Sequence, residues 1–146
     1  MIYISHRGNL SSIDSSLENS PIYIEKALQQ NFYVEIDLWM QNNKLYLGHD
    51  LPQYEIEKTF LDNKYFFVHC KNHEALQFMS NENLDCEYFW HQDDKYTLTS
   101  KNKIWVHPSA ELLKDSICVL PELSRTEDLS LCYGICSDYI IRYRNE

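Results

Sequence analysis

The stretch Val34-Glu35-Ile36-Asp37-Leu38 alternates apolar and acidic residues. Successive side chains of a β-strand point to opposite faces, so this alternation predicts a strand with one apolar and one acidic face. Two carboxylates on one face near a strand end suit a hard divalent cation such as Mg²⁺ or Ca²⁺. A solvent-exposed acidic face is the alternative interpretation, although it would be unusual on a parallel strand, which is commonly buried on both sides.

Similar short segments rich in Ile, Val, Phe, Tyr and Trp recur along the chain, and polar clusters separate them. Their composition and length predict strands. The predicted strands are 2–5, 33–39, 44–47, 65–70, 88–90, 104–106, 117–120 and 133–137, with a hairpin turn at Asn42-Asn43. Apolar residues at helical spacing predict helices at 21–30 and 72–81 and shorter helical segments at 54–61, 110–113 and 140–144. The early alternation of strand and helix predicts parallel βαβ units.

The histidines share one position relative to these strands. Five of the six lie at or near the carboxyl end of a predicted strand, namely His6, His49, His69, His91 and His107, and His73 alone lies in a helical segment. Functional sites of parallel α/β proteins assemble at the carboxyl ends of strands. One histidine in such a place is more often a structural residue, but five predict a common cleft.

Composition limits the classes of protein to consider. The 146 residues are enough for one domain, 1–146, with its own core. A net charge of −9 argues against a nucleic-acid or anionic-membrane partner, because both need a cationic face. No stretch approaches 18 apolar residues, so we expect no membrane span. Five cysteines, an odd number, and an N-terminus without a signal-peptide pattern favour a cytoplasmic protein with reduced thiols.

Several short motifs occur in a characteristic order. They are Ile4-Ser5-His6-Arg7-Gly8, Glu18-Asn19-Ser20-Pro21, Val34-Glu35-Ile36-Asp37, Leu47-Gly48-His49-Asp50 and, near the end, Gly134-Ile135-Cys136-Ser137-Asp138-Tyr139. The set resembles the glycerophosphodiester phosphodiesterase family, which belongs to the phospholipase C-like TIM-barrel phosphodiesterases. The resemblance is specific over residues 2–50 and looser in the middle of the chain.

The resemblance implies a role for each matching residue. His6 and His49 would be the general acid and base, and Glu35, Asp37 and Glu18 would form the metal site. Arg7 and Lys71 would bind the phosphate. In Val68-His69-Cys70-Lys71, His69 occupies the position of the family's third carboxylate ligand. Three alternatives follow: the metal is Mg²⁺ or Ca²⁺ held by two carboxylates and waters, it is a transition ion such as Mn²⁺, or metal binding is weakened.

The resemblance also implies a fold, which the length restricts. A (β/α)₈ barrel typically takes about 250 residues, and eight complete units cannot fit into 146. We therefore expect a compact or incomplete TIM-like α/β barrel with several helices shortened or missing. The apolar surface left uncovered would favour a homodimer.

The function implied is metal-assisted hydrolysis of a small polar glycerophosphodiester-type substrate. One alternative is a phosphodiester lyase, in which a substrate hydroxyl attacks and a cyclic phosphate forms. A second is a binding protein for sugar or polyol phosphates without turnover. Trp39, Trp90 and Trp105 are candidate stacking walls for a sugar or polyol, and core packing is the alternative for these side chains.

Overall fold

The computed structural model describes residues 1–123 and 128–145, so the predicted domain 1–146 includes five positions outside the described residues. The described strands are β1 Ile2–His6, β2 Tyr33–Gln41, β3 Lys44–Leu47, β4 Tyr54–Ile56, β5 Phe66–Cys70, β6 Glu87–Trp90, β7 Tyr96–Leu98, β8 Ile104–Val106, β9 Ile117–Val119 and β10 Gly134–Ser137. The described helices are α1 Pro21–Gln29, α2 Lys58–Leu61, α3 His73–Asn81 and α4 Ile140–Asn145, with two 3₁₀ turns, η1 Pro121–Leu123 and η2 Leu129–Leu131.

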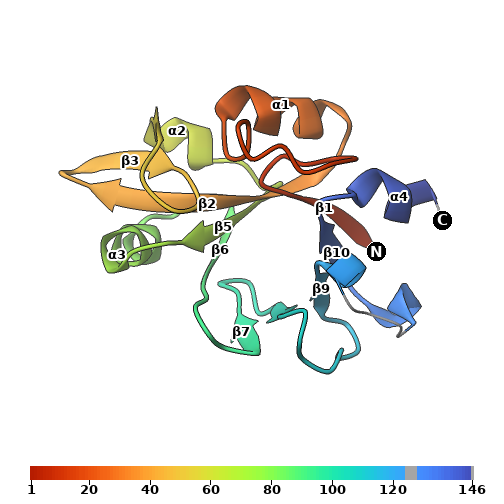
Figure 1. Ribbon diagram of the computed structural model, residues 1–146. Helices are drawn as coiled ribbons and strands as arrows, with labels where there is room; N and C mark the ends of the chain where they lie inside the picture. The colour runs from red at the N-terminus through yellow and green to blue at the C-terminus, as the bar shows by residue number, and fades with distance from the viewer. Residues whose placement is uncertain (124–127, 146) are drawn as a thin grey trace.

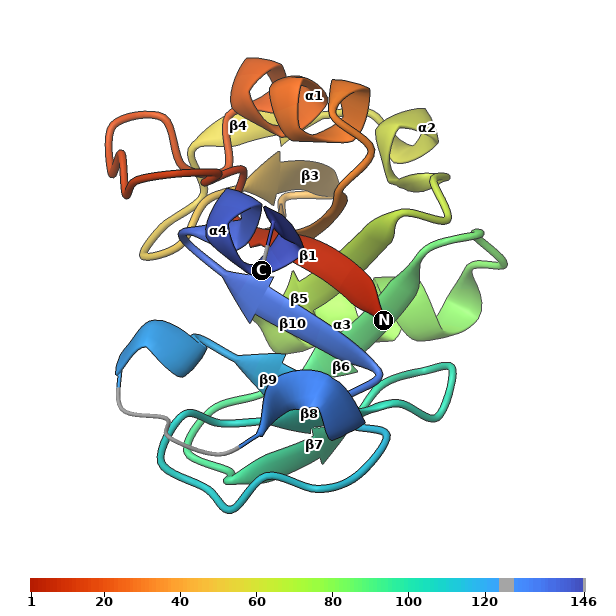
Figure 2. The ribbon, with the colours of Figure 1, turned by 90° about the vertical axis from the view of Figure 1, so that its right-hand side faces the viewer.

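All ten strands belong to one mixed sheet. Its parallel part runs β6-β5-β2-β1-β10-β9-β8, and Figure 2 shows β1, β10, β9 and β8 following one another down the molecule. Antiparallel strands join at two places: β3 folds back on the carboxyl half of β2 and pairs in turn with β4, and β7 pairs with β8. The prediction that α1 and α3 connect parallel neighbours is confirmed by the β1–β2 and β5–β6 registers.

The predicted TIM-like barrel is wrong. Within the described residues no strand ladder joins β6 to β7 or β8, so the sheet stays open. The connections between β7 and β10 contain no described α-helix, so the outer ring that a barrel requires is missing on this side. Side-chain packing spans the open edge, since Phe89 of β6 stacks on Trp105 of β8 with ring centroids 4.5 Å apart. The short chain therefore forms a curved open sheet.

The two faces of the sheet have different cores. All four α-helices pack on one face, where Val34, Ile36 and Leu38 contact buried residues of the helices. Figure 1 shows α1 and α2 above β2 and β3, while β7 and β9 lie below without an α-helix beside them. The opposite face carries a smaller cluster that includes Phe89 and Trp105. The alternation of β2 thus directs its apolar side chains to the helices and its carboxylates to the opposite face.

Local sequence explains most element boundaries. Asn42 and Asn43 both have positive φ, 52° and 60°, which confirms the hairpin turn between β2 and β3. Asn72 caps α3 by accepting a hydrogen bond from the Ala75 amide. Pro21 occupies the first turn of α1, where a missing N–H has no cost.

Three short segments differ from the prediction. Residues 54–61 divide into strand β4 and helix α2, and residues 110–113 are not helical. Strand β7 was not predicted, because its three residues gain their stability from pairing with β8 and not from a local pattern. None of the described helices is long and apolar enough to cross a bilayer.

Candidate functional site

Strand register brings the central side chains together. His6 lies opposite Glu35 in the β1–β2 ladder, and Asp37 lies opposite His69 in the β2–β5 ladder. Because the three strands are parallel, these pairs lie at the same edge of the sheet. The predicted acidic face of β2 is therefore buried among histidines, with Glu35 2% and Asp37 0% exposed.

His49 reaches the same edge by a different route. Strand β3 runs antiparallel to β2, and the Gly48 amide after it donates to the Asp37 carbonyl at 3.1 Å. Gly48 has φ +155°, and the Leu51 carbonyl oxygen occupies the place that a Cβ would take. This loop sets the His49 Nδ1 atom 3.4 Å from Asp37 Oδ2.

Asp37 is the centre of the charged cluster. Its carboxylate lies 3.0 Å from Arg7 Nε and 3.1 Å from His69 Nδ1, and Asn19 Nδ2 donates to it at 2.9 Å. Lys71 Nζ lies 3.8 Å away. Burial alone would raise the pKa of Asp37, but hydrogen bonds from the histidines and the charge of Arg7 hold that pKa well below its usual value. Asp37 is therefore an anion with positive groups on several sides.

Glu35 is equally buried but has fewer partners. Its Oε2 atom lies 3.8 Å from His6 Nε2 and makes no hydrogen bond. Burial, and next the neighbouring Asp37 charge, raise the pKa of Glu35 above its ordinary value. A buried carboxylate oxygen without a hydrogen bond is costly unless a cation or a proton satisfies it.

Glu35, Asp37 and His69 fit a divalent cation. Each offers one ligand atom, and the three atoms lie within 4.8 Å of one another. Glu35 Oε2 is buried without a hydrogen bond, whereas Asp37 Oδ1 lies 3.1 Å from His69 Nδ1. Two oxygens and one imidazole nitrogen suit Mn²⁺ or a similar ion at least as well as Mg²⁺.

Glu18 lies outside this group of three. Its Oε1 accepts from Asn9 Nδ2 at 2.8 Å, and its Oε2 lies 3.4 Å from Arg7 Nη1. These contacts make Glu18 a partner that orients the Arg7 guanidinium. Its role as a metal ligand stays a prediction.

His6 has a carboxylate partner that the sequence analysis did not assign. His6 Nδ1 lies 2.7 Å from Asp138 Oδ1, and Asn9 Nδ2 donates to the same oxygen at 2.8 Å. Burial lowers the pKa of His6, but the Asp138 hydrogen bond and the Glu35 charge outweigh it, so the net pKa is raised. The pairing leaves His6 Nε2 facing Glu35.

The signals for the two missed residues, Asp138 and Asn19, were present in the sequence. Asp138 directly follows β10, at the same strand-end position that identified the histidines. Asn19 has φ 62°, a left-handed conformation that asparagine tolerates well, and its side chain bonds both the Asp37 amide and carboxylate. Both were quoted within motifs, but neither was given a role.

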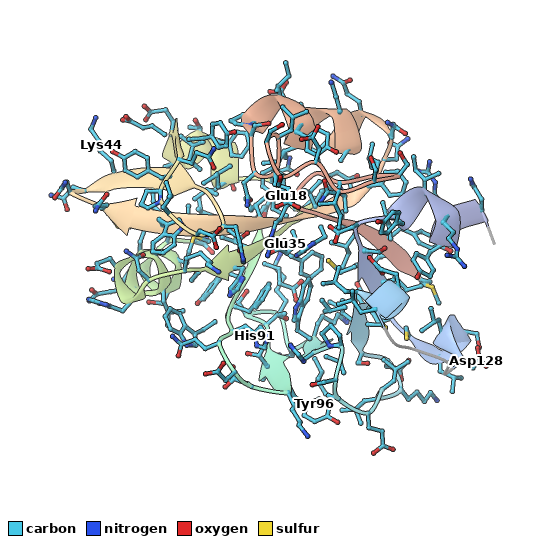
Figure 3. The ribbon with its side chains drawn as sticks, viewed as in Figure 1. Glu18, Glu35, Lys44, His91, Tyr96 and Asp128 are labelled. Carbon is cyan, nitrogen blue, oxygen red and sulfur yellow. The ribbon has the colours of Figure 1, made fainter. Side chains whose placement is uncertain are left out.

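One cavity of about 630 Å³ is lined by six of the eight predicted site residues, whereas Asp37 is fully buried and Glu18 lines a separate pocket with His49. The polar end of the cavity is lined by His6, Arg7, Glu35, His49, His69 and Lys71. His91 and His107 line it farther along, so the predicted convergence of five histidines is confirmed, and His73 lies apart on α3. Figure 3 shows Glu18 and Glu35 near the middle of the view with His91 below them, whereas Lys44 and Asp128 lie at the margins.

The tryptophans do not form a stacking platform. Trp105 is 4% exposed and packs between Phe89 and Phe67. Trp39 donates from Nε1 to the Gly48 carbonyl and supports the His49 loop. Trp90 lines the cavity and also packs against the helix-side core. Core packing, the alternative considered from the sequence, describes Trp105 best.

Comparison with known proteins adds no assignment. No family model matches the chain, and no match was found among curated proteins or solved structures. The chemistry of the site is therefore argued from its own residues.

Proposed function

We propose that this chain is a metal-assisted phosphodiester hydrolase. The observation that supports the proposal is a cavity lined by Glu35 and His69 of a carboxylate-carboxylate-histidine group, whose third member Asp37 is fully buried, and by two further histidines and two fixed cations. A metal group, acid–base groups and phosphate-binding cations are the components that phosphodiester hydrolysis requires.

Glu35, Asp37 and His69 would hold the divalent cation. When bound, such an ion neutralises charge on non-bridging phosphate oxygens. The buried Glu35 Oε2, which makes no hydrogen bond, is the observation that favours a cation here. The surrounding Asn19 and Lys71 hold the Asp37 carboxylate in place and thereby keep the group assembled.

Arg7 and Lys71 would bind the substrate phosphate. Both line the cavity and both contact Asp37, so their charged groups lie beside the metal group. Glu18 orients the Arg7 guanidinium from the other side. This arrangement gives a protein of net charge −9 a local site for an anion.

His6 and His49 would transfer the protons. Asp138 accepts the Nδ1–H of neutral His6, which leaves Nε2 able to take a proton from an attacking water. The oxygen of that water bonds to phosphorus as the bond from phosphorus to one alcohol oxygen breaks. The departing alkoxide takes a proton from the second histidine, so the products are a phosphomonoester and an alcohol.

A panel of phosphodiesters with Mg²⁺, Ca²⁺ or Mn²⁺ tests the proposal. We expect metal-dependent turnover that falls by at least about 10²-fold in His6→Ala and in His49→Ala. His73→Ala is the matched control, because the His73 side chain is 85% exposed on α3. No turnover with any ion, or turnover that survives both substitutions, would refute the proposal.

The same experiment separates the two alternatives. A cyclic phosphate in the ³¹P NMR spectrum of the product would identify a lyase, because the attacking oxygen then comes from the substrate. Saturable binding of phosphate esters without turnover would identify a binding protein. The small polar substrate, the cytoplasmic location and the homodimer stay predictions.

A further inference from the structure

The lining of the cavity includes an apolar wall. Of the residues described as lining the cavity, only Arg7, Glu35 and Lys71 carry a formal charge. The apolar wall consists of Phe89, Trp105, Val119, Leu120 and Leu123, and the remaining lining includes the polar side chains of His91, Gln92, His107 and Ser109. Glu122, between the two leucines, accepts a hydrogen bond from the Asp138 amide at 3.0 Å, so the wall lies beside the His6–Asp138 pair.

Leu120 is the most informative residue of the apolar wall. It follows β9 with φ +46°, a left-handed conformation that a bulky residue rarely adopts. Its amide donates to the Cys136 carbonyl at 2.7 Å, so the chain is anchored to β10 in this conformation. A glycine would be less strained at this position, yet a leucine side chain lines the cavity.

Leu123 is a second leucine of the apolar wall. It is 65% exposed although it lines the cavity, and its amide donates to the Leu120 carbonyl at 3.1 Å. The short 3₁₀ turn η1 therefore holds two leucines at one side of the cavity. An apolar group placed between them and the ring edges would remove apolar surface from water on both sides.

We infer that one alcohol of the substrate carries an apolar group, such as a short alkyl chain, that lies in the cavity against Val119, Leu120 and Leu123 of the apolar wall. The inference rests on the proposed function, because the phosphate at the polar end anchors the molecule. It replaces the small polar substrate expected from the sequence with a diester that is polar at phosphorus and apolar at one alcohol.

Calorimetric titration with methylphosphonate and butylphosphonate in the presence of Mn²⁺ tests the inference without turnover. A fully buried methylene contributes about a fourfold gain in affinity, so three partly buried methylenes should give about a tenfold preference for butylphosphonate. Equal affinities, a preference for methylphosphonate, or no binding of either probe would overturn the inference.

Substitutions test whether Leu120 causes the preference for butylphosphonate over methylphosphonate. Leu120→Gly should reduce the butyl-to-methyl affinity ratio by about fivefold, because it removes the side chain and relaxes the backbone. Leu98→Ala is the control and should keep the wild-type ratio, because Leu98 is 60% exposed on β7 and lines a different pocket. If Leu120→Gly does not fold, Leu120→Asn also tolerates positive φ and presents a polar group to the cavity. A ratio that is unchanged in the folded Leu120 variant would overturn the inference.

The outcomes distinguish this inference from the proposed function. A tenfold butyl preference with no hydrolysis of any diester would uphold the apolar subsite and reject the hydrolase. Turnover of diesters with equal probe affinities would uphold the hydrolase and reject the subsite.

Discussion

The first 90 residues and the segment from β7 to β9 are built differently around the same cavity. The first region has three α-helices and supplies the charged groups at the polar end. The segment from β7 to β9 has no described α-helix and supplies Trp105, Val119 and the histidine His107. The contrast shows that the formal charges of the cavity come from the helix-covered region, whereas the segment from β7 to β9 contributes apolar side chains and His107.

The largest expected effect concerns the charged region. Asp37→Asn should reduce kcat/KM for a phosphodiester by about 10³-fold, or about 4 kcal/mol, because it removes a metal-group carboxylate and the anion that Arg7, His49 and His69 surround. The measurement is steady-state kinetics together with Mn²⁺ titration. Asp128→Asn, at the margin of Figure 3, serves as the control because asparagine also caps η2.

The second prediction tests whether the two regions fold as one unit. Trp105→Ala should lower the free energy of unfolding by about 3 kcal/mol, because Trp105 packs against Phe89 and Phe67 of the first region. Urea denaturation measures the loss, and Leu98→Ala should stay within about 0.5 kcal/mol of wild type. Amide hydrogen exchange should then accelerate in both regions. Acceleration in residues 96–119 alone would show that the regions unfold independently.

The third prediction concerns the link that β10 makes between the regions. Asp138→Asn should reduce kcat by about 10²-fold, or about 2.7 kcal/mol, with little change in KM, because asparagine carries no negative charge and its amide N–H donates to His6 Nδ1, which favours the other ring tautomer. The ¹⁵N spectrum of the His6 ring should show loss of the Nδ1–H form. An unchanged ring spectrum with reduced kcat would contradict a positioning role.

The smallest expected effect lies in the helix-covered core. Burial raises the pKa of the Cys86 thiol to about 11, so the folded state keeps this thiol protonated where the unfolded chain ionises near pH 9. The stability that the neutral thiol contributes is present below pH 9 and is lost as pH rises toward 11, by about 2 kcal/mol. Urea midpoints at pH 8, 9.5 and 10.5 measure the decrease. Cys86→Ala should make the decrease smaller by about this amount, and an equally steep decrease would assign it to other groups such as Cys70, whose thiol pKa burial raises to about 12.

Local patterns predicted the first region well. The alternation in β2, the Asn42-Asn43 turn and the apolar spacing of α3 are each determined by residues close in sequence. The convergence of the histidines also followed, because parallel strands present their carboxyl ends at one edge. These features depend on strand direction and side-chain alternation, which a sequence expresses directly.

Longer-range features were predicted less well. Whether the sheet closes depends on the separation of β6 and β8. Phe89 and Trp105 stack between these two strands, which form no ladder with each other. Strand β7 and the contacts of Glu18 depend on partners distant in sequence or on loops of irregular shape. The His6–Asp138 pair joins residues 132 positions apart. No local pattern specifies such pairs.

The sequence by itself determined which residues could do chemistry and on which strand ends they would lie, because period-two alternation and the order of elements are local properties of the chain. Only the tertiary structure decided that the sheet stays open, that Asp138 pairs with His6, and that an apolar wall faces the charged cluster. The physical reason is that these features arise from packing between strands β1, β6, β8 and β10, whose relative positions depend on the core as a whole.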